Sequence, residues 1–158
     1  MKKLLFGFLL FLGACGFSPL YQKIESESAS VPVEVAPIPN QYGFMMRQVL
    51  QSKFGSSSQD IYLLTLTAPT FLQWDQTIDD KNFTTIMGIS GSVSYQLTDK
   101  ASQKVLLKNS TTLASSYSVV KDPYATVVAK QKVEKELARQ LAEQVSLHVL
   151  GTLAGVSH

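Results

Sequence analysis

The feature that most constrains the fold is a run of alternating side chains over residues 84–97. Its two sets of alternate positions are apolar Met87, Ile89, Val93, Tyr95 and Leu97 and polar Ser90, Ser92, Ser94 and Gln96. Such alternation places the two sets on opposite faces of a β-strand. After a polar turn at residues 98–102, residues 104–117 run back with Val105, Leu107, Leu113 and Tyr117 in one parity. The sequence therefore predicts a long antiparallel hairpin over residues 84–117, with one face in the core.

The segments before this hairpin predict two strands and a helix. Residues 31–38 alternate valines with prolines, which suits an edge strand because proline cannot donate to a central ladder. Asn40 is a suitable N-cap for a helix over residues 42–54, whose apolar residues share one face. Residues 60–74 are apolar on both faces at first, which favours a single central strand.

A second helix follows the hairpin. Asp122 supplies an N-cap acceptor, and Pro123 suits the first helical position. The helix is expected to run to about Leu150, with Gly151 as its C-cap. The order β-α-β-β-β-α predicts an α+β fold, in which two helices pack on one face of a mostly antiparallel four-stranded sheet.

The N-terminus has the form of an export signal. Lys2 and Lys3 precede an apolar run over residues 4–12, which is too short to span a bilayer. The segment then ends in Leu12-Gly13-Ala14-Cys15, which resembles the lipobox of bacterial lipoproteins. In those proteins the cysteine is lipidated and the preceding segment is removed. We therefore expect a signal peptide over residues 1–14, a lipidated tether over residues 15–30, and a single domain over residues 31–158.

Cysteine and charge agree with this interpretation. Cys15 is the only cysteine, so no intramolecular disulfide can form. Removal of residues 1–14 takes two lysines and no acids, so the formal net charge of +2 falls to zero. The basic precursor therefore gives no reason to expect a nucleic-acid partner. Only 16% of the residues are charged, which favours a surface that a partner partly covers.

The sequence shows no motif for catalysis or metal binding. The only histidines are His148 and His158, and no histidine, cysteine or carboxylate cluster has metal-ligand spacing. The run Gly88-Ile89-Ser90-Gly91 lies inside a strand pattern, where glycine marks a bulge or a close backbone approach. We expect no enzyme activity, no catalytic or metal-binding residue, and no cofactor besides the lipid on Cys15. A lipid-anchored hydrolase that uses His148 with scattered serines and aspartates is the alternative.

The polar face of the hairpin is the remaining candidate site. Its side chains are small and hydroxylated, with lysines at one end; the candidate contact residues are Ser92, Ser94, Gln96, Lys104 and Lys108. One interpretation is the ordinary solvated face of a one-sided sheet. The other is a contact surface for a polar partner wall or an anionic glycolipid, whose phosphates the lysines can pair as point charges.

A specific resemblance begins at the expected mature N-terminus. The heptad Cys15-Gly16-Phe17-Ser18-Pro19-Leu20-Tyr21 resembles the C-G-F-x-P-L-Y start of LPS-assembly lipoproteins of the LptE (RlpB-like) family, of the alphaproteobacterial type. The later segments follow the layout of that family over essentially the whole mature chain. They include Ile38-Pro39 before the first helix and Asp122-Pro123-Tyr124-Ala125 before the second.

The resemblance implies a function. Proteins of this family sit at the periplasmic face of the outer membrane and fill the lumen of a large β-barrel, the LPS translocon LptD. They help the barrel to assemble and assist lipopolysaccharide transport to the cell surface, as structural plugs rather than catalysts. Residues 75–92 depart from the pattern, since they hold few basic residues for lipid phosphates. The alternative is an accessory or pilot lipoprotein of another envelope transport or secretion complex.

Overall fold

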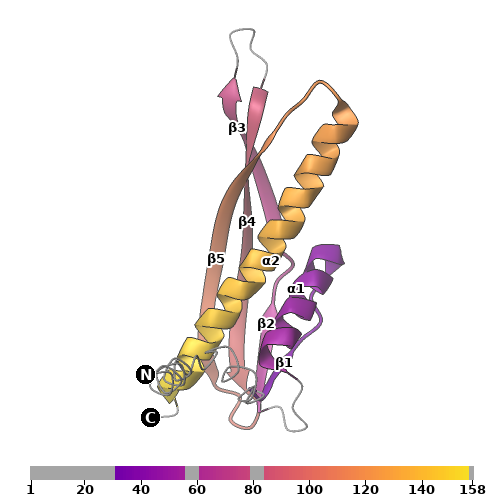
Figure 1. Cartoon of the computed structure of the whole chain (residues 1–158). Helices are drawn as coiled ribbons and strands as arrows, with labels where there is room; N and C mark the ends of the chain where they lie inside the picture. The colour runs from indigo at the N-terminus through magenta and orange to yellow at the C-terminus, as the bar shows by residue number, and fades with distance from the viewer. Residues whose placement is uncertain (1–30, 56–60, 79–83, 157–158) are drawn as a thin grey trace, which may run out of the picture.

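The computed structural model describes residues 31–55, 61–78 and 84–156, and it shows five strands and two helices in one α+β unit. The predicted signal peptide and the predicted tether, with Cys15, lie outside the described residues. The elements, in chain order, are β1 Val33–Val35, α1 Asn40–Phe54, β2 Tyr62–Leu66, β3 Thr70–Ile78, β4 Thr84–Asp99, β5 Val105–Ser118 and α2 Pro123–Val156 (Figure 1).

The long strand β4 is the axis of the sheet. β5 runs antiparallel along one side of it, from the pair Thr98–Val105 to the pair Ile86–Ser118. On the other side β2 and β3 lie end to end, and both are antiparallel to β4. β1 pairs in parallel with β2 and forms the short outer edge at that end. The predicted hairpin and the predicted edge strand are therefore confirmed.

The sheet has five strands rather than four, because residues 60–74 do not form one continuous strand. β2 ends at Leu66, which pairs with Tyr95, and β3 begins at Thr70, which pairs with Ser92. Three residues, 67–69, thus lie opposite only two positions of β4, Val93 and Ser94. Pro69 lies inside this offset and has no N–H to give to the ladder. The proline therefore divides the expected strand into two.

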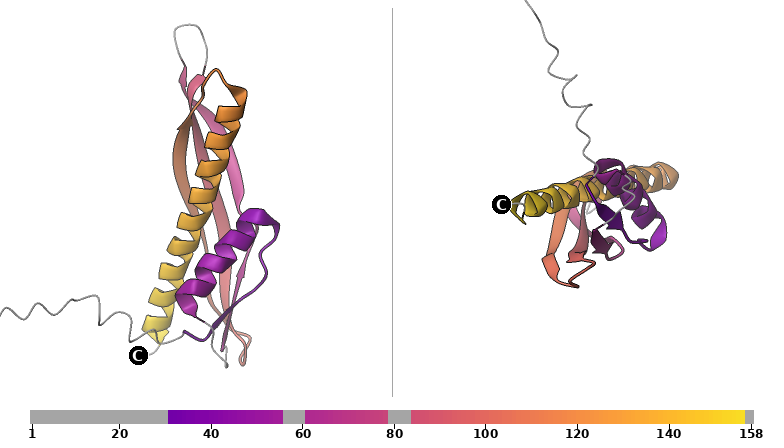
Figure 2. Two further views of the ribbon diagram at one scale, coloured as in Figure 1. Left: turned by 45° about the vertical axis from the view of Figure 1, so that its right-hand side comes forward. Right: turned by 90° about the horizontal axis from the view of Figure 1, so that it is seen from below.

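Both helices cover the same face of the sheet (Figure 2). The apolar side chains of β4 point toward them, so that Val93, Tyr95 and Leu97 are buried. The core is completed by side chains of β1, β2, α1 and α2, namely Val33, Val35, Leu64, Met46, Leu50, Phe54, Ala138, Leu141, Ala142, Val145 and Val149. A smaller cluster of Ile89, Tyr117 and Leu137 continues the core toward the N-terminal end of α2.

The helix starts agree with the sequence, but one helix end does not. Asn40 Oδ1 accepts from the Gly43 N–H at 2.8 Å, and Asp122 Oδ1 accepts from the Tyr124 N–H at 2.9 Å, as N-caps do. Helix α2 continues through Gly151 to Val156, so the predicted C-cap is wrong. Leu153, beyond the glycine, still packs against the core, and this packing offsets the helix cost of glycine, about 1 kcal/mol.

Candidate functional site

The face of the sheet that points away from the helices carries a shallow groove. Two hollows adjoin along β4 and share Thr67, Ser94 and Ser110, and the larger has a volume of about 540 Å³. We call this surface the hydroxyl groove. Its polar lining residues come from β2, β3, β4, β5 and the β2–β3 connection, and they are Thr65, Thr67, Thr70, Ser92, Ser94, Gln96, Lys108, Asn109, Ser110 and Thr112.

Hydrogen bonds across the strands order these side chains. The hydroxyls of Thr70 and Ser92 lie 2.8 Å apart, and Thr67 Oγ1 accepts from the Ser94 N–H at 3.1 Å. Along β4 itself, Gln96 Nε2 donates to Thr98 Oγ1 at 3.2 Å. A hydroxyl has one donor and two acceptor sites, so these contacts leave hydrogen-bonding capacity for a bound surface. The groove can therefore recognise polar groups, such as those of a protein wall or a sugar.

The groove is almost uncharged. Lys108 is its single charged side chain, and no carboxylate lines it within the described residues. The structure brings together four of the five predicted contact residues, Ser92, Ser94, Gln96 and Lys108. The fifth, Lys104, lies in the turn before β5 and does not line the groove. The sequence pattern did not predict that threonines of β2 and β3 line the groove, because their position on this face depends on the division of residues 60–74 into two strands.

Beyond the groove, the same face becomes apolar. The Trp74 indole lies over Gly88 of β4, where an ideal Cβ would be 2.1 Å from the ring atom Cε2. Gly88 thus makes room for a side chain, whereas the sequence predicted a bulge or a close backbone approach at this glycine. Leu72, two residues along β3, is 70% exposed. The outer face thus joins a hydroxylated half to a half that presents large apolar side chains.

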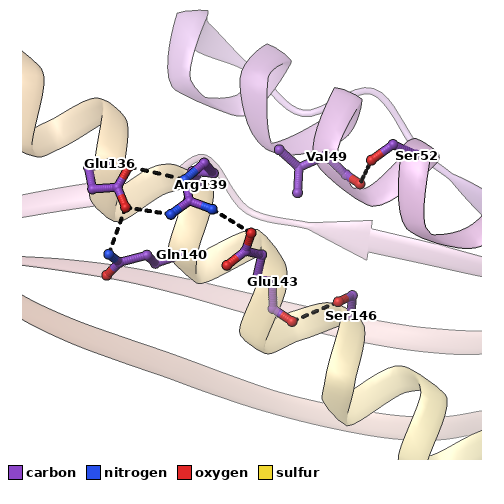
Figure 3. Close-up of polar contacts among 7 residues, drawn as sticks. All are labelled: Val49, Ser52, Glu136, Arg139, Gln140, Glu143 and Ser146. Carbon is purple, nitrogen blue, oxygen red and sulfur yellow. Dashed lines mark hydrogen bonds and ion pairs between the residues drawn. The ribbon is translucent and has the colours of Figure 1, made fainter. Parts of the chain in front are cut away.

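The opposite surface of the molecule is charged. On α2, Arg139 donates to Glu136 through Nη2 at 2.6 Å and through Nε at 3.0 Å, and it also binds Glu143 (Figure 3). The hydrogen bond from Arg139, with a second from Gln140, lowers the pKa of Glu136 to about 2. The three charged side chains are 38–49% exposed, so the network contributes little to stability. It marks α2 as a solvated surface, in contrast to the neutral groove.

A buried polar contact joins the two helices. The Tyr42 hydroxyl of α1 donates to Glu134 of α2, and Lys130 forms an ion pair with the same carboxylate at 3.7 Å. Burial, together with the hydrogen bond to this carboxylate, raises the pKa of Tyr42 to about 12. The Tyr42 ring also packs edge-on against Phe71 of β3, with centroids 5.1 Å apart. The cluster fixes α1 against α2 and β3, which is a structural role.

His148 is exposed, and its Nδ1 hydrogen-bonds the hydroxyl of the buried Tyr95. Thr111 Oγ1 approaches the same hydroxyl at 3.5 Å. Among residues 31–55, 61–78 and 84–156, no group of three or more His, Cys, Asp or Glu side chains is placed to hold a metal ion. The contact of His148 is with a core tyrosine and not with a serine nucleophile, so this geometry favours a structural histidine.

Neither helix of the described chain is both long and apolar enough to span a lipid bilayer.

Comparisons with known proteins establish the fold. No protein-family model and no curated protein sequence matches the chain. Among solved structures, a candidate lipoprotein of Caulobacter crescentus CB15 has a TM-score of 0.60 at 20% identity, covering 85% of this chain and 98% of that one. Rare lipoprotein B of Shewanella oneidensis has a TM-score of 0.60 at 12% identity, with 80% and 98% covered. The uncharacterized lipoprotein B of Nitrosomonas europaea has a TM-score of 0.54 at 12% identity, with 78% and 86% covered. The chain thus shares the fold of proteins that are named as lipoproteins.

Proposed function

We propose that this protein is an outer-membrane lipoprotein of the LptE (RlpB-like) type, which plugs the LPS-translocon barrel LptD, helps it to assemble and assists lipopolysaccharide transport. The observation that carries the proposal is the fold shared with rare lipoprotein B over 98% of that chain. The heptad that begins at Cys15 also supports it, because it resembles the mature start of that family.

The proposed anchor is compatible with the domain. Cys15 carries the lipid, and residues 16–30 connect it to Val31, whose N–H donates to the Phe54 carbonyl at the end of α1. The attachment point is therefore at the end of the sheet where β1 and β2 lie (Figure 1). Two or more acyl chains hold a protein stably at a bilayer, so a lipidated Cys15 needs no membrane-spanning helix to keep the domain at the periplasmic face of the outer membrane.

The hydroxyl groove suits the proposed partner. The interior of an outer-membrane barrel is polar, and a neutral surface rich in hydroxyls can form hydrogen bonds with such a wall without burying unpaired charge. A carboxylate in the groove would repel lipid phosphates, and none is present among the described lining residues. Lys108 at the groove, with Lys104 in the nearby turn, is the proposed contact for a lipopolysaccharide phosphate.

Affinity purification tests the proposal directly. The detergent-solubilised protein, tagged at its C-terminus and expressed in its native host, is expected to recover one large outer-membrane barrel at about a one-to-one ratio. Cys15→Ala removes the lipid and is expected to reduce recovery, because the protein no longer concentrates at the membrane. Recovery of no barrel, or of a secretin or an inner-membrane transport complex, would contradict the proposal; the latter result would support the accessory-lipoprotein alternative.

A further inference from the structure

The outer edge of β5 carries unpaired backbone groups. β5 pairs with β4 and with no other described strand. The Val119 N–H donates to the Thr85 carbonyl at 2.9 Å, which fixes the alternation of the ladder. Odd-numbered residues from 107 to 119 therefore bond to β4, and even-numbered residues direct their N–H and C=O groups away from the sheet. The edge thus presents a regular row of donors and acceptors.

Most of this row is accessible. The Ser110 N–H is satisfied by the side chain of Asn109 at 2.8 Å. The next even-numbered residues, Thr112, Ala114, Ser116 and Ser118, are all exposed, and no described segment pairs with them. Residues 109–118 contain no charge, no proline and no glycine. Apart from the Ser110 N–H, the edge of these ten residues can therefore accept an added strand.

The other two edges of the sheet are protected. β1 has three residues, follows Pro32, and carries Glu34 in an ion pair with Lys100. β3 follows Pro69, carries Asp75 and has two register shifts near its end. Short strands, charges, prolines and bulges are the devices that keep sheet edges from pairing. The edges at β1 and β3 have these features, and residues 109–118 of β5 lack them. The edge of β5 is therefore the one suited to pairing with another strand.

We infer that the edge of β5 binds an extended, uncharged segment of the barrel partner by strand addition. This inference rests on the proposed function. The side chains of Ser110 and Thr112 line the hydroxyl groove, and the backbone groups of the same strand form the edge. An added strand would therefore widen the groove surface, and one partner could cover both the edge and the outer face.

A second copy of this chain fits the edge less well. Two sheets that pair edge to edge lie in one plane, so each contributes only the ten residues of the edge and leaves the outer face open. A stable interface takes about 20–30 residues from each side. A partner that adds a strand at β5 and also lies against the groove reaches that size, whereas the edge-only dimer does not.

Proline substitution at the edge tests the inference in the full-length, lipidated protein. The double variant Ala114→Pro with Ser116→Pro removes two N–H groups that β4 does not use, so the β4–β5 ladder is retained. Each lost backbone bond is expected to reduce the apparent affinity for the barrel about fivefold. The matched control, Ala114→Val with Ser116→Val, changes side chains outside the hydroxyl groove and keeps both N–H groups, and it is expected to retain most of the barrel recovery.

Circular dichroism and thermal unfolding verify that both variants fold. A folded proline variant that recovers the barrel as well as the wild type overturns the inference and leaves the proposed function intact. Failure of the wild type to recover any barrel overturns both. A second measurement needs no proline: a photo-reactive benzoylphenylalanine at Ser116 should cross-link to the barrel far more than one at Asp75. Equal cross-linking, or a cross-linked dimer of this chain, contradicts the inference.

Discussion

The two faces of β4 carry side chains of opposite character on one backbone. Toward the helices, Val93, Tyr95 and Leu97 are buried in the core. Away from them, Ser92, Ser94 and Gln96 line the hydroxyl groove. The core face therefore determines whether the domain folds, and the outer face is free to serve binding. Substitutions on the two faces should separate stability from partner recovery.

The largest effect is expected on the core face. Leu97→Ala removes a fully buried side chain and leaves a cavity, so the free energy of unfolding should fall by about 3 kcal/mol. Urea unfolding of the purified protein in detergent, followed by circular dichroism, measures the change. The neighbouring outer-face variant Gln96→Ala is the control, with an expected loss below about 0.5 kcal/mol. Equal losses in the two variants would refute the division between the faces.

The contact between the helices should come next. Tyr42→Phe removes the hydrogen bond to Glu134. Because this bond has a charged acceptor, the free energy of unfolding should fall by about 2 kcal/mol. The folded pKa of Tyr42, about 12, exceeds the usual value of 10.0. The stability that the protonated Tyr42 hydroxyl contributes is therefore complete below pH 10, and it is lost as the pH rises toward 12. Tm measured from pH 8 to pH 12 should fall less steeply for the variant; identical slopes would contradict this account.

Gly88 is the place where the outer face itself contributes to stability. Gly88→Ala puts a Cβ against the Trp74 indole, which must then move, at an expected cost of about 1 kcal/mol. Because Trp74 is the only tryptophan, its fluorescence reports the movement directly. Gly151→Ala serves as the control: a Cβ there meets open space inside α2, so a gain of up to about 1 kcal/mol is expected. Unchanged emission from the Gly88 variant would show that the indole does not lie on this glycine.

The smallest effect on stability, and a large one on binding, is expected in the hydroxyl groove. Ser92→Asp with Ser94→Asp adds charge to the exposed face, so Tm should change by only a few degrees. Barrel recovery should fall at least tenfold, because two carboxylates would be desolvated against a neutral wall. Ser92→Ala with Ser94→Ala controls for loss of the hydroxyls alone. Undiminished recovery with the aspartates would show that the partner does not contact this groove.

The sequence predicted the parts of the fold that depend on one segment at a time. Alternation along residues 84–97 revealed the hairpin and both faces of β4, and Asn40 and Asp122 marked the helix starts through a local hydrogen bond. The division at Pro69 could not be derived, because it depends on which residues of β4 pair with each half. The end of α2 depends on packing of Leu153 against a core formed by distant residues, which no local signal encodes.

Only part of the candidate site was predicted, because a local pattern shows only which residues of one segment share a face. Ser92, Ser94, Gln96 and Lys108 lie on paired strands of one hairpin, so their parity placed them together. Thr65, Thr67 and Thr70 joined them only through the register of β2 and β3. Lys104 was assigned to this face by its parity, but the structure places it in the turn before β5.

Depletion of the protein in its native host tests the central claim most directly, with surface lipopolysaccharide and maturation of the translocon barrel followed over time. The account predicts that surface lipopolysaccharide falls and that immature barrel accumulates as the protein disappears. Restoration by the wild-type chain, but not by the Ser92→Asp with Ser94→Asp variant, would connect the effect to the hydroxyl groove. A normal surface and a mature barrel under full depletion would contradict the account.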